Sequence, residues 1–149
     1  MNGKFRFRLD RVLAVREHEE DRAREGYAER LRLEQQGAER VQAAAERIAR
    51  AGETQRDAIA TARSGAELFA AQVWRERSER ARHEAAVELA HLRVELERAR
   101  EALVAAHRDR RALTMLRERR LDEHKREAAR REAALIDDMA GRRSPAVAA

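Results

Sequence analysis

The stretch 66–140 contains neither glycine nor proline, so no residue in it is expected to interrupt a helix. Its apolar residues recur at alternating steps of three and four, which is typical of a helix with one buried stripe. These residues are Leu89, Leu92, Leu96, Ala99, Leu103, Ala106 and Leu113. A helix of this length without internal caps indicates a coiled coil. We therefore predict a second helix over residues 66–140, which needs a partner for its stripe.

The first half of the chain carries a weaker stripe of the same period, which predicts a first helix over residues 9–62. Gly26, Gly37 and Gly52 each cost about 1 kcal/mol relative to alanine inside a helix, and we expect a possible kink near residue 52. Small residues also let two helices approach closely. We expect these glycines to serve mainly that purpose.

A break separates the two stripes at Ser64, which is followed three residues later by Glu67. This spacing is that of a capping box, in which the serine accepts a hydrogen bond from a free backbone amide. The sequence therefore predicts a turn at residues 63–66 and an all-α fold, an elongated two-helix antiparallel coiled-coil hairpin. Counting from the turn places Leu9 opposite a position near Arg117. The rest of the second helix is then an overhang without an intramolecular partner.

The hairpin is expected to form one domain over residues 1–149, with an extended segment at residues 1–8 and a disordered tail at residues 141–149, where Gly141 ends the second helix. Charged residues make up 41% of the chain and aromatic residues 3%, which suffices for a narrow seam only. The chain has no cysteine and no run of about 20 apolar residues, and its basic start lacks a signal-peptide apolar run. These features favour a soluble, cytoplasmic protein.

The net charge of +5 favours an acidic partner, such as a nucleic acid, an anionic membrane surface or an acidic protein. However, 28 acidic residues are interleaved with 33 basic ones, which is typical of a solvated helix with ion pairs four residues apart. No arrangement for catalysis is evident. Glu88 and His91 match one Glu-x-x-His element of di-iron bundles without a second copy, His18 lacks the second histidine of a zinc-protease helix, and no glycine-rich phosphate loop occurs. We predict no enzyme, no cofactor and no metal site.

Two stretches stand out as candidate surfaces. The densest cluster of large apolar residues follows the turn directly and consists of Leu68, Phe69, Val73 and Trp74. It is either a docking patch for a partner protein or a core at the tip, covered by Ile59. The second stretch is the charged run 116–127 and its continuation to Glu132, which lies on the overhang. Phe5 and Phe7 either close the end of the seam or contact a partner.

Two motifs at the ends of the chain resemble the FliJ family of flagellar protein-export components. The first is the pattern of Phe5, Phe7, Leu9, Val12, Leu13, Arg16 and Glu20. The second is the pattern of Leu116, Glu118, Arg119, Arg120, Glu123, His124, Glu127, Arg130, Arg131, Glu132 and Asp137. The resemblance spans nearly the whole chain, and His124 stands where the family typically has a tyrosine.

The resemblance implies a stalk-like coiled coil without catalytic activity in the flagellar type III export apparatus, at the cytoplasmic face of the inner membrane. Its terminal end would enter the pore of the hexameric export ATPase through Phe5, Phe7, Arg117, Arg119, Arg120, His124, Arg130 and Arg131. Its hairpin side would contact the membrane export gate and export chaperones through Leu68, Phe69, Val73 and Trp74. The alternatives are a basic coiled-coil arm that binds nucleic acid and a generic structural coiled coil that dimerises along the overhang.

Overall fold

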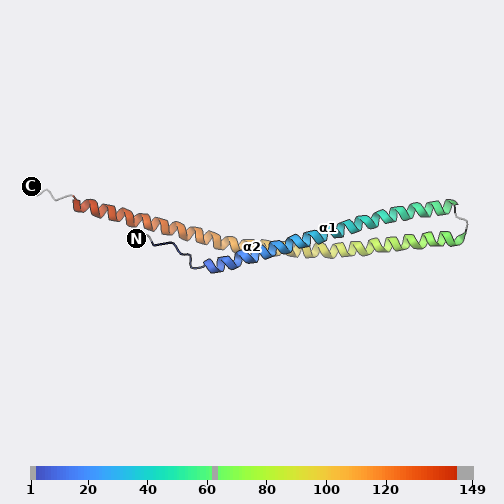
Figure 1. The fold of residues 1–149 in the computed structure, drawn as a ribbon, viewed down its shortest axis with the longest axis horizontal. Coiled ribbons are helices and arrows are strands. Elements are labelled where there is room, and N and C mark those ends of the chain that lie inside the picture. The colour runs from blue at the N-terminus through green and yellow to red at the C-terminus, as the bar shows by residue number, and fades with distance from the viewer. Residues whose placement is uncertain (1–2, 62–63, 144–149) are drawn as a thin grey trace, which may run out of the picture. The chain divides into compact units, whose positions relative to one another are not determined.

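Two long α-helices account for nearly all of the residues that the structure, a computed structural model, describes, namely 3–61 and 64–143 (Figure 1). Helix α1 spans Asp10–Thr61 and helix α2 spans Gly65–Arg143. No β-strand occurs in these residues. The prediction of an all-α, two-helix hairpin is confirmed.

Neither of the glycines that were expected to bend or end a helix does so. Helix α1 is continuous through Gly52, where the neighbouring Ala51 is fully buried against α2. Helix α2 continues through Gly141 to Arg143, and an ion pair of 3.2 Å between Arg142 and Asp138 spans its last turn. A single glycine costs only about 1 kcal/mol in a helix, so neighbouring contacts of this kind are sufficient to carry the helix through it. The remainder of the predicted tail, residues 144–149, lies outside the described residues.

Ser64 caps the start of α2. Its side-chain oxygen Oγ accepts a hydrogen bond of 3.4 Å from the backbone N–H of Glu67, as the sequence spacing predicts. The helix begins at Gly65, one residue before the predicted start. Residues 62 and 63, which contain part of the predicted turn, lie outside the described residues.

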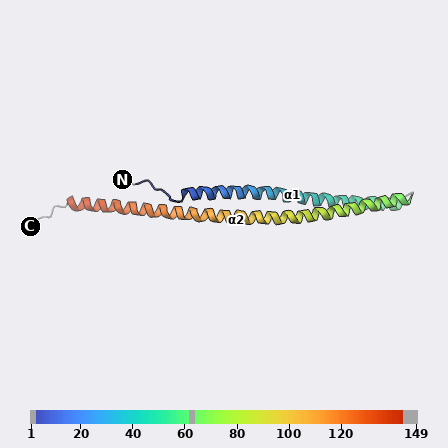
Figure 2. The same ribbon diagram turned by 90° about the horizontal axis from the view of Figure 1, so that it is seen from below.

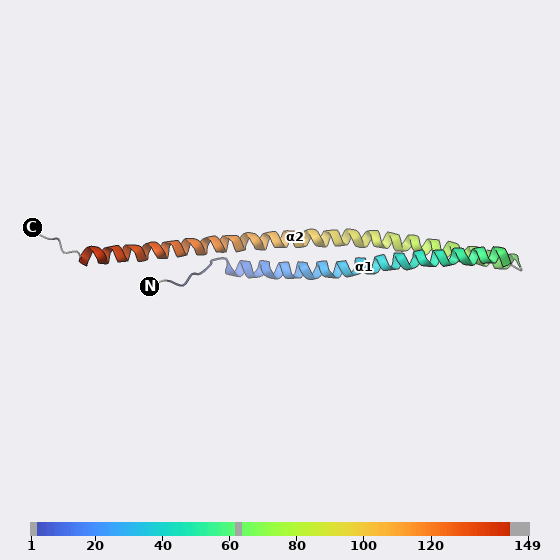
Figure 3. The ribbon, with the colours of Figure 1, turned by 90° about the horizontal axis from the view of Figure 1, so that it is seen from above.

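The chain divides into two units. The first, which we call the turn unit, is Asp21–Val104, and in it α1 and α2 lie side by side and run antiparallel (Figure 2, Figure 3). Its seam is narrow because small side chains fill it: Ala44, Ala51 and Ala71 are buried together with Leu89. Arg30 and Glu95 form an ion pair across the seam, as do Glu34 and Arg93.

Close approach of the two helices depends on one of the three glycines of α1. A Cβ atom on Gly37 would lie 2.7 Å from Cδ1 of Leu92 and 3.3 Å from Cδ1 of Leu89, whereas one on Gly26 or Gly52 would meet nothing within 4 Å. The expectation that all three glycines permit close packing is therefore confirmed for Gly37 alone. Gly26 and Gly52 are not needed for close approach of the helices.

The second unit, the terminal unit, consists of Met1–Glu20 and Ala105–Ala149. Here the first turns of α1 pack antiparallel on α2, and Asp10 forms an ion pair of 3.4 Å with Arg117. The predicted register is thereby confirmed. Residues 3–9, which we call the N-terminal arm, are not helical and lie along α2 beyond the start of α1. The predicted overhang is therefore partly covered.

Candidate partner-binding surfaces

The N-terminal arm packs on α2 with every second side chain. Phe7 is only 8% exposed, and Phe5 and Leu9 are partly buried. Lys4, Arg6 and Arg8 lie between them in the sequence and are exposed. Over residues 3–7 this alternation is typical of an extended segment, in which successive side chains point to opposite sides, and Arg8 and Leu9 then form the turn that leads into α1. The arm thus has an apolar side against α2 and a basic side in solvent.

His124 holds the start of the arm. Its Nε2 lies 3.1 Å from the backbone carbonyl oxygen of Gly3, at hydrogen-bond distance, and its ring centroid lies 5.6 Å from that of Phe5 with the ring planes tilted by 48°. A groove beside these rings is lined by Leu116, Arg120, Glu123 and Glu127 as well as by the arm. Phe5 and His124 are partly exposed, so their contact with a partner stays a prediction, whereas Phe7 is buried. For Phe7 the structure favours the reading that it closes the seam.

The five arginines predicted for the terminal surface differ in their surroundings. Arg117 pairs with Asp10, Arg120 pairs with Glu123 at 3.0 Å, and Arg131 pairs with Glu127 at 3.6 Å. Arg119 and Arg130 are exposed, and neither has an ion pair within the described part of the chain. These two are the members of the set most available to a partner.

The last turns of α2 carry an apolar surface that the sequence analysis did not single out. All described residues after 128 are exposed, including Leu135, Ile136 and Met139. Leu135 and Met139 are four residues apart and therefore share one side of the helix. The sequence does contain these three large apolar residues within five positions. The many charged residues around them made this stretch resemble a solvated helix.

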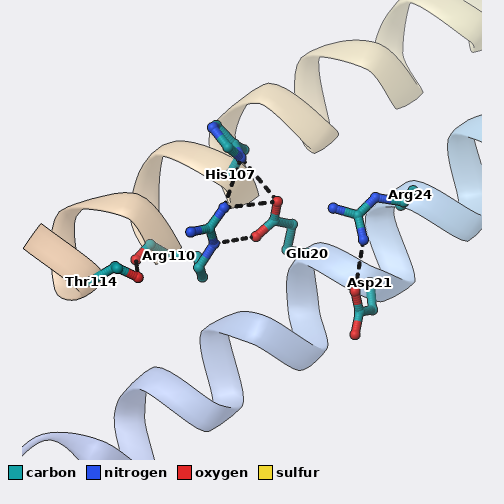
Figure 4. A network of polar contacts seen from close by, with 6 residues as sticks. All are labelled: Glu20, Asp21, Arg24, His107, Arg110 and Thr114. Carbon is teal, nitrogen blue, oxygen red and sulfur yellow. Dashed lines mark hydrogen bonds and ion pairs between the residues drawn. The ribbon is translucent and has the colours of Figure 1, made fainter.

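A polar cluster interrupts the seam of the terminal unit (Figure 4). Glu20 of α1 is only 5% exposed and faces two residues of α2. Nε and Nη2 of Arg110 donate to its two carboxylate oxygens at 2.6 and 3.4 Å, and Nδ1 of His107 lies 2.9 Å from Oε1. These hydrogen bonds, first that from Arg110 and then that from His107, lower the pKa of Glu20 to about 2 against the opposing effect of burial. The pKa of Arg110 is raised by the same contact.

The turn unit exposes most of the predicted apolar cluster. Phe69 is 71% exposed, Trp74 is 42% exposed and Leu68 is also exposed, whereas Val73 is partly buried. Ile59, which would cover the cluster if it formed a core, is itself exposed. Phe69 and Trp74 are five residues apart and so lie on different sides of α2, since each residue turns the helix by about 100°. The reading of a covered core is wrong for Phe69.

Metal-binding clusters and membrane-spanning helices are both absent from residues 3–61 and 64–143. No group of three or more histidine, cysteine or carboxylate side chains is placed to hold a metal ion there. None of the helices in this part of the chain has a segment apolar enough to cross a bilayer.

Taken together, the antiparallel helices, the Glu20 cluster in the seam and the exposed apolar and charged residues of both units define a helical scaffold of the coiled-coil class. The sequence model of one family, described as flagellar FliJ protein, matches residues 5–146, and the chain belongs to this family. No curated protein and no solved structure gives a significant match. Family membership identifies the chain as a structural component of the flagellar export apparatus.

Proposed function

We propose that this chain is a stalk-like component that couples the flagellar export ATPase to the membrane export gate and to export chaperones. In this proposal the terminal unit enters the pore of the hexameric ATPase ring, and the turn unit contacts the gate and the chaperones. The chain would then be peripheral at the cytoplasmic face of the inner membrane, held there by its partners.

The observation that carries the proposal is the exposed end of α2. Leu135, Ile136 and Met139 are large apolar side chains in solvent, and Arg119 and Arg130 are exposed cations near them in the chain. A partner that buries this surface must reach a helix from more than one side, because the apolar and charged residues do not share one face. A ring with a central pore has this geometry. The FliJ family assignment supports the choice of the export ATPase as that ring.

A second surface is required if the chain is to couple two partners. Phe69 supplies the strongest candidate, because a large aromatic side chain that is mostly exposed is a common anchor in protein interfaces. Helix α2 contains residues of both units, so one continuous helix contributes to both proposed contacts. Binding at one end would bias the other end only if each partner distinguishes states of the hairpin.

A co-purification experiment separates the two contacts. Tagged protein is expressed in a flagellated bacterium, and bound proteins are quantified by mass spectrometry. The variant Phe69→Ser should lose the gate protein and keep the ATPase, and the charge reversals Arg119→Glu and Arg130→Glu should do the opposite. Loss of both partners in both variants, or capture of neither partner by the unaltered chain, would contradict the proposal.

A further inference from the structure

The exposed side of the N-terminal arm is a row of cations that no contact within the described chain neutralises. Lys4, Arg6 and Arg8 are exposed and form no ion pair or hydrogen bond there. The acidic residues near them are paired with other arginines, Asp10 with Arg117, Glu123 with Arg120 and Glu127 with Arg131. On the helices, by contrast, acidic side chains lie within a turn or two of most arginines. The arm therefore concentrates positive charge that forms no ion pair within the described chain.

Lys4 and Arg6 lie in the part of the arm before the turn at Arg8 and Leu9, and this part is fixed on its other side. Phe5, Phe7 and Leu9 pack on α2, and His124 lies at hydrogen-bond distance from the carbonyl of Gly3. In an extended chain, alternate side chains on one side are about 6.6 Å apart, a spacing that applies to Lys4 and Arg6, whereas Arg8 belongs to the turn before α1. An extended partner segment with acidic residues at every second position has the same repeat.

The arm also has backbone groups available for pairing. Among the described residues, the carbonyl of Phe7 accepts from the backbone N–H of Asp10, and that of Gly3 contacts His124. No backbone hydrogen bond is formed by Lys4, Phe5 or Arg6. An immobilised extended segment with unpaired N–H and C=O groups is an edge to which another strand can add.

We propose that the N-terminal arm binds an extended acidic peptide segment of a partner protein by strand addition, with alternate acidic side chains against Lys4 and Arg6 and a further acidic side chain against Arg8. A peptide fits better than a nucleic acid or a lipid surface, because only a peptide can match both the charge repeat and the backbone edge. The inference depends on the arm alone and holds whether or not the export ATPase and gate are the partners proposed above.

The test uses the full chain and synthetic peptides. One labelled peptide alternates glutamate and threonine, a second has the same composition with all glutamates in one block, and a third is the alternating peptide with its amides N-methylated at every second residue. Fluorescence anisotropy should show the alternating peptide binding about tenfold more tightly than either of the others, since only it has both matched charges and free amides. Equal affinity for the alternating and block peptides, or no binding of any of them, would overturn the proposal.

Matched variants locate the site on the chain. The triple change of Lys4, Arg6 and Arg8 to glutamine should weaken binding of the alternating peptide about tenfold. The control variant changes three exposed arginines of α1 to glutamine, namely Arg40, Arg47 and Arg50, and so removes the same charge. It should leave the affinity for the peptide unaltered. Circular dichroism should show unchanged helicity for both, because all six side chains are exposed. Equal losses in the two variants, or arm-dependent binding that is tighter for single-stranded DNA or phosphatidylglycerol vesicles than for the peptide, would contradict the assignment.

Discussion

Nε of Arg110 donates a 2.6 Å hydrogen bond to Oε2 of Glu20, and this contact joins α2 to α1 inside the seam of the terminal unit. A two-helix seam made of small and aliphatic residues can slide by a heptad at little cost, because one apolar layer resembles the next. A buried carboxylate that has one well-placed guanidinium partner removes this freedom. A slipped pairing would leave the charge buried and unpaired, which is costly.

The carboxyl group of Glu20 should make stability depend on pH in acid. Its pKa is about 2 in the folded chain, below the ordinary value of 4.5, so the folded state binds this proton less readily than the unfolded state does. The resulting stabilisation is complete above about pH 4.5 and is lost as the pH falls towards 2. Urea unfolding between pH 6 and pH 2 should show a steeper loss for the unaltered chain than for Glu20→Gln. Parallel curves for the two proteins would show that Glu20 is not the group responsible.

Removal of the Glu20 side chain alone should destabilise the hairpin, whereas replacement of both Glu20 and Arg110 by leucine should not. The variant Glu20→Ala leaves Arg110 without its main partner and should lower the free energy of unfolding by about 1–3 kcal/mol. The double variant with leucine at both positions should recover most of this loss.

In the double leucine variant, α1 and α2 should nevertheless pair in more than one register. Cysteines introduced at Arg16 and Asp109, whose charged groups Nη1 and Oδ2 lie 3.5 Å apart, report the native register when a short bifunctional maleimide joins them. Cysteines at Arg16 and Leu116 report a slip of one heptad. The maleimide should join only the native pair in the otherwise unaltered chain, and it should join either pair in the leucine variant. A leucine variant that cross-links only in the native register would show that the apolar seam suffices to set it.

Two glycine-to-alanine changes on the same helix should have different effects. Gly26→Ala removes a helix-destabilising residue in open space and should raise the free energy of unfolding by about 0.5–1 kcal/mol. Gly37→Ala brings the same gain in helix propensity but drives a methyl group into Leu92, so it should give a smaller gain or a net loss. Thermal melting of the two variants measures the difference. Equal stabilisation by both would mean that the helices do not approach closely at Gly37.

Phe69 and Trp74 should differ in how much they contribute to folding. Phe69→Ser removes a side chain that is mostly in solvent and should change the free energy of unfolding by less than about 0.5 kcal/mol. Trp74→Ser removes a half-buried side chain and should cost about 1–2 kcal/mol. Urea unfolding of the single variants checks this order. A loss for Phe69→Ser as large as that for Trp74→Ser would show that Phe69 belongs to the core.

The hairpin could be predicted from the sequence because its signals are local. The alternating apolar spacing of α2 and the pair of Ser64 and Glu67 specify two helices and the place where they separate. Once the turn is known, residue counting gives the register, as the contact of Asp10 with Arg117 shows. Gly52 and Gly141 were misjudged because a local propensity of about 1 kcal/mol is smaller than the effect of tertiary and side-chain contacts.

The surfaces could be predicted only in part, because they depend on contacts between residues far apart in the chain. The pattern of Phe5, Phe7 and Leu9 predicts an extended segment, but not that it lies on α2 beside His124. The Glu20 cluster likewise joins residues that are 87 and 90 positions apart, and its charges look in the sequence like those of any solvated helix face.

The ATPase activity of the purified export ATPase, measured with increasing amounts of this chain, tests the central proposal most directly. The full chain should stimulate hydrolysis at well below one copy per ATPase subunit, because one stalk serves a whole ring. Truncation after Ala128 keeps His124 and the groove of the N-terminal arm but removes Leu135, Ile136 and Met139, and it should abolish the stimulation. Truncation after Arg143 keeps all of α2 and should preserve it. Stimulation that survives loss of residues 129–149, or that is absent at every ratio of the full chain, would contradict the account.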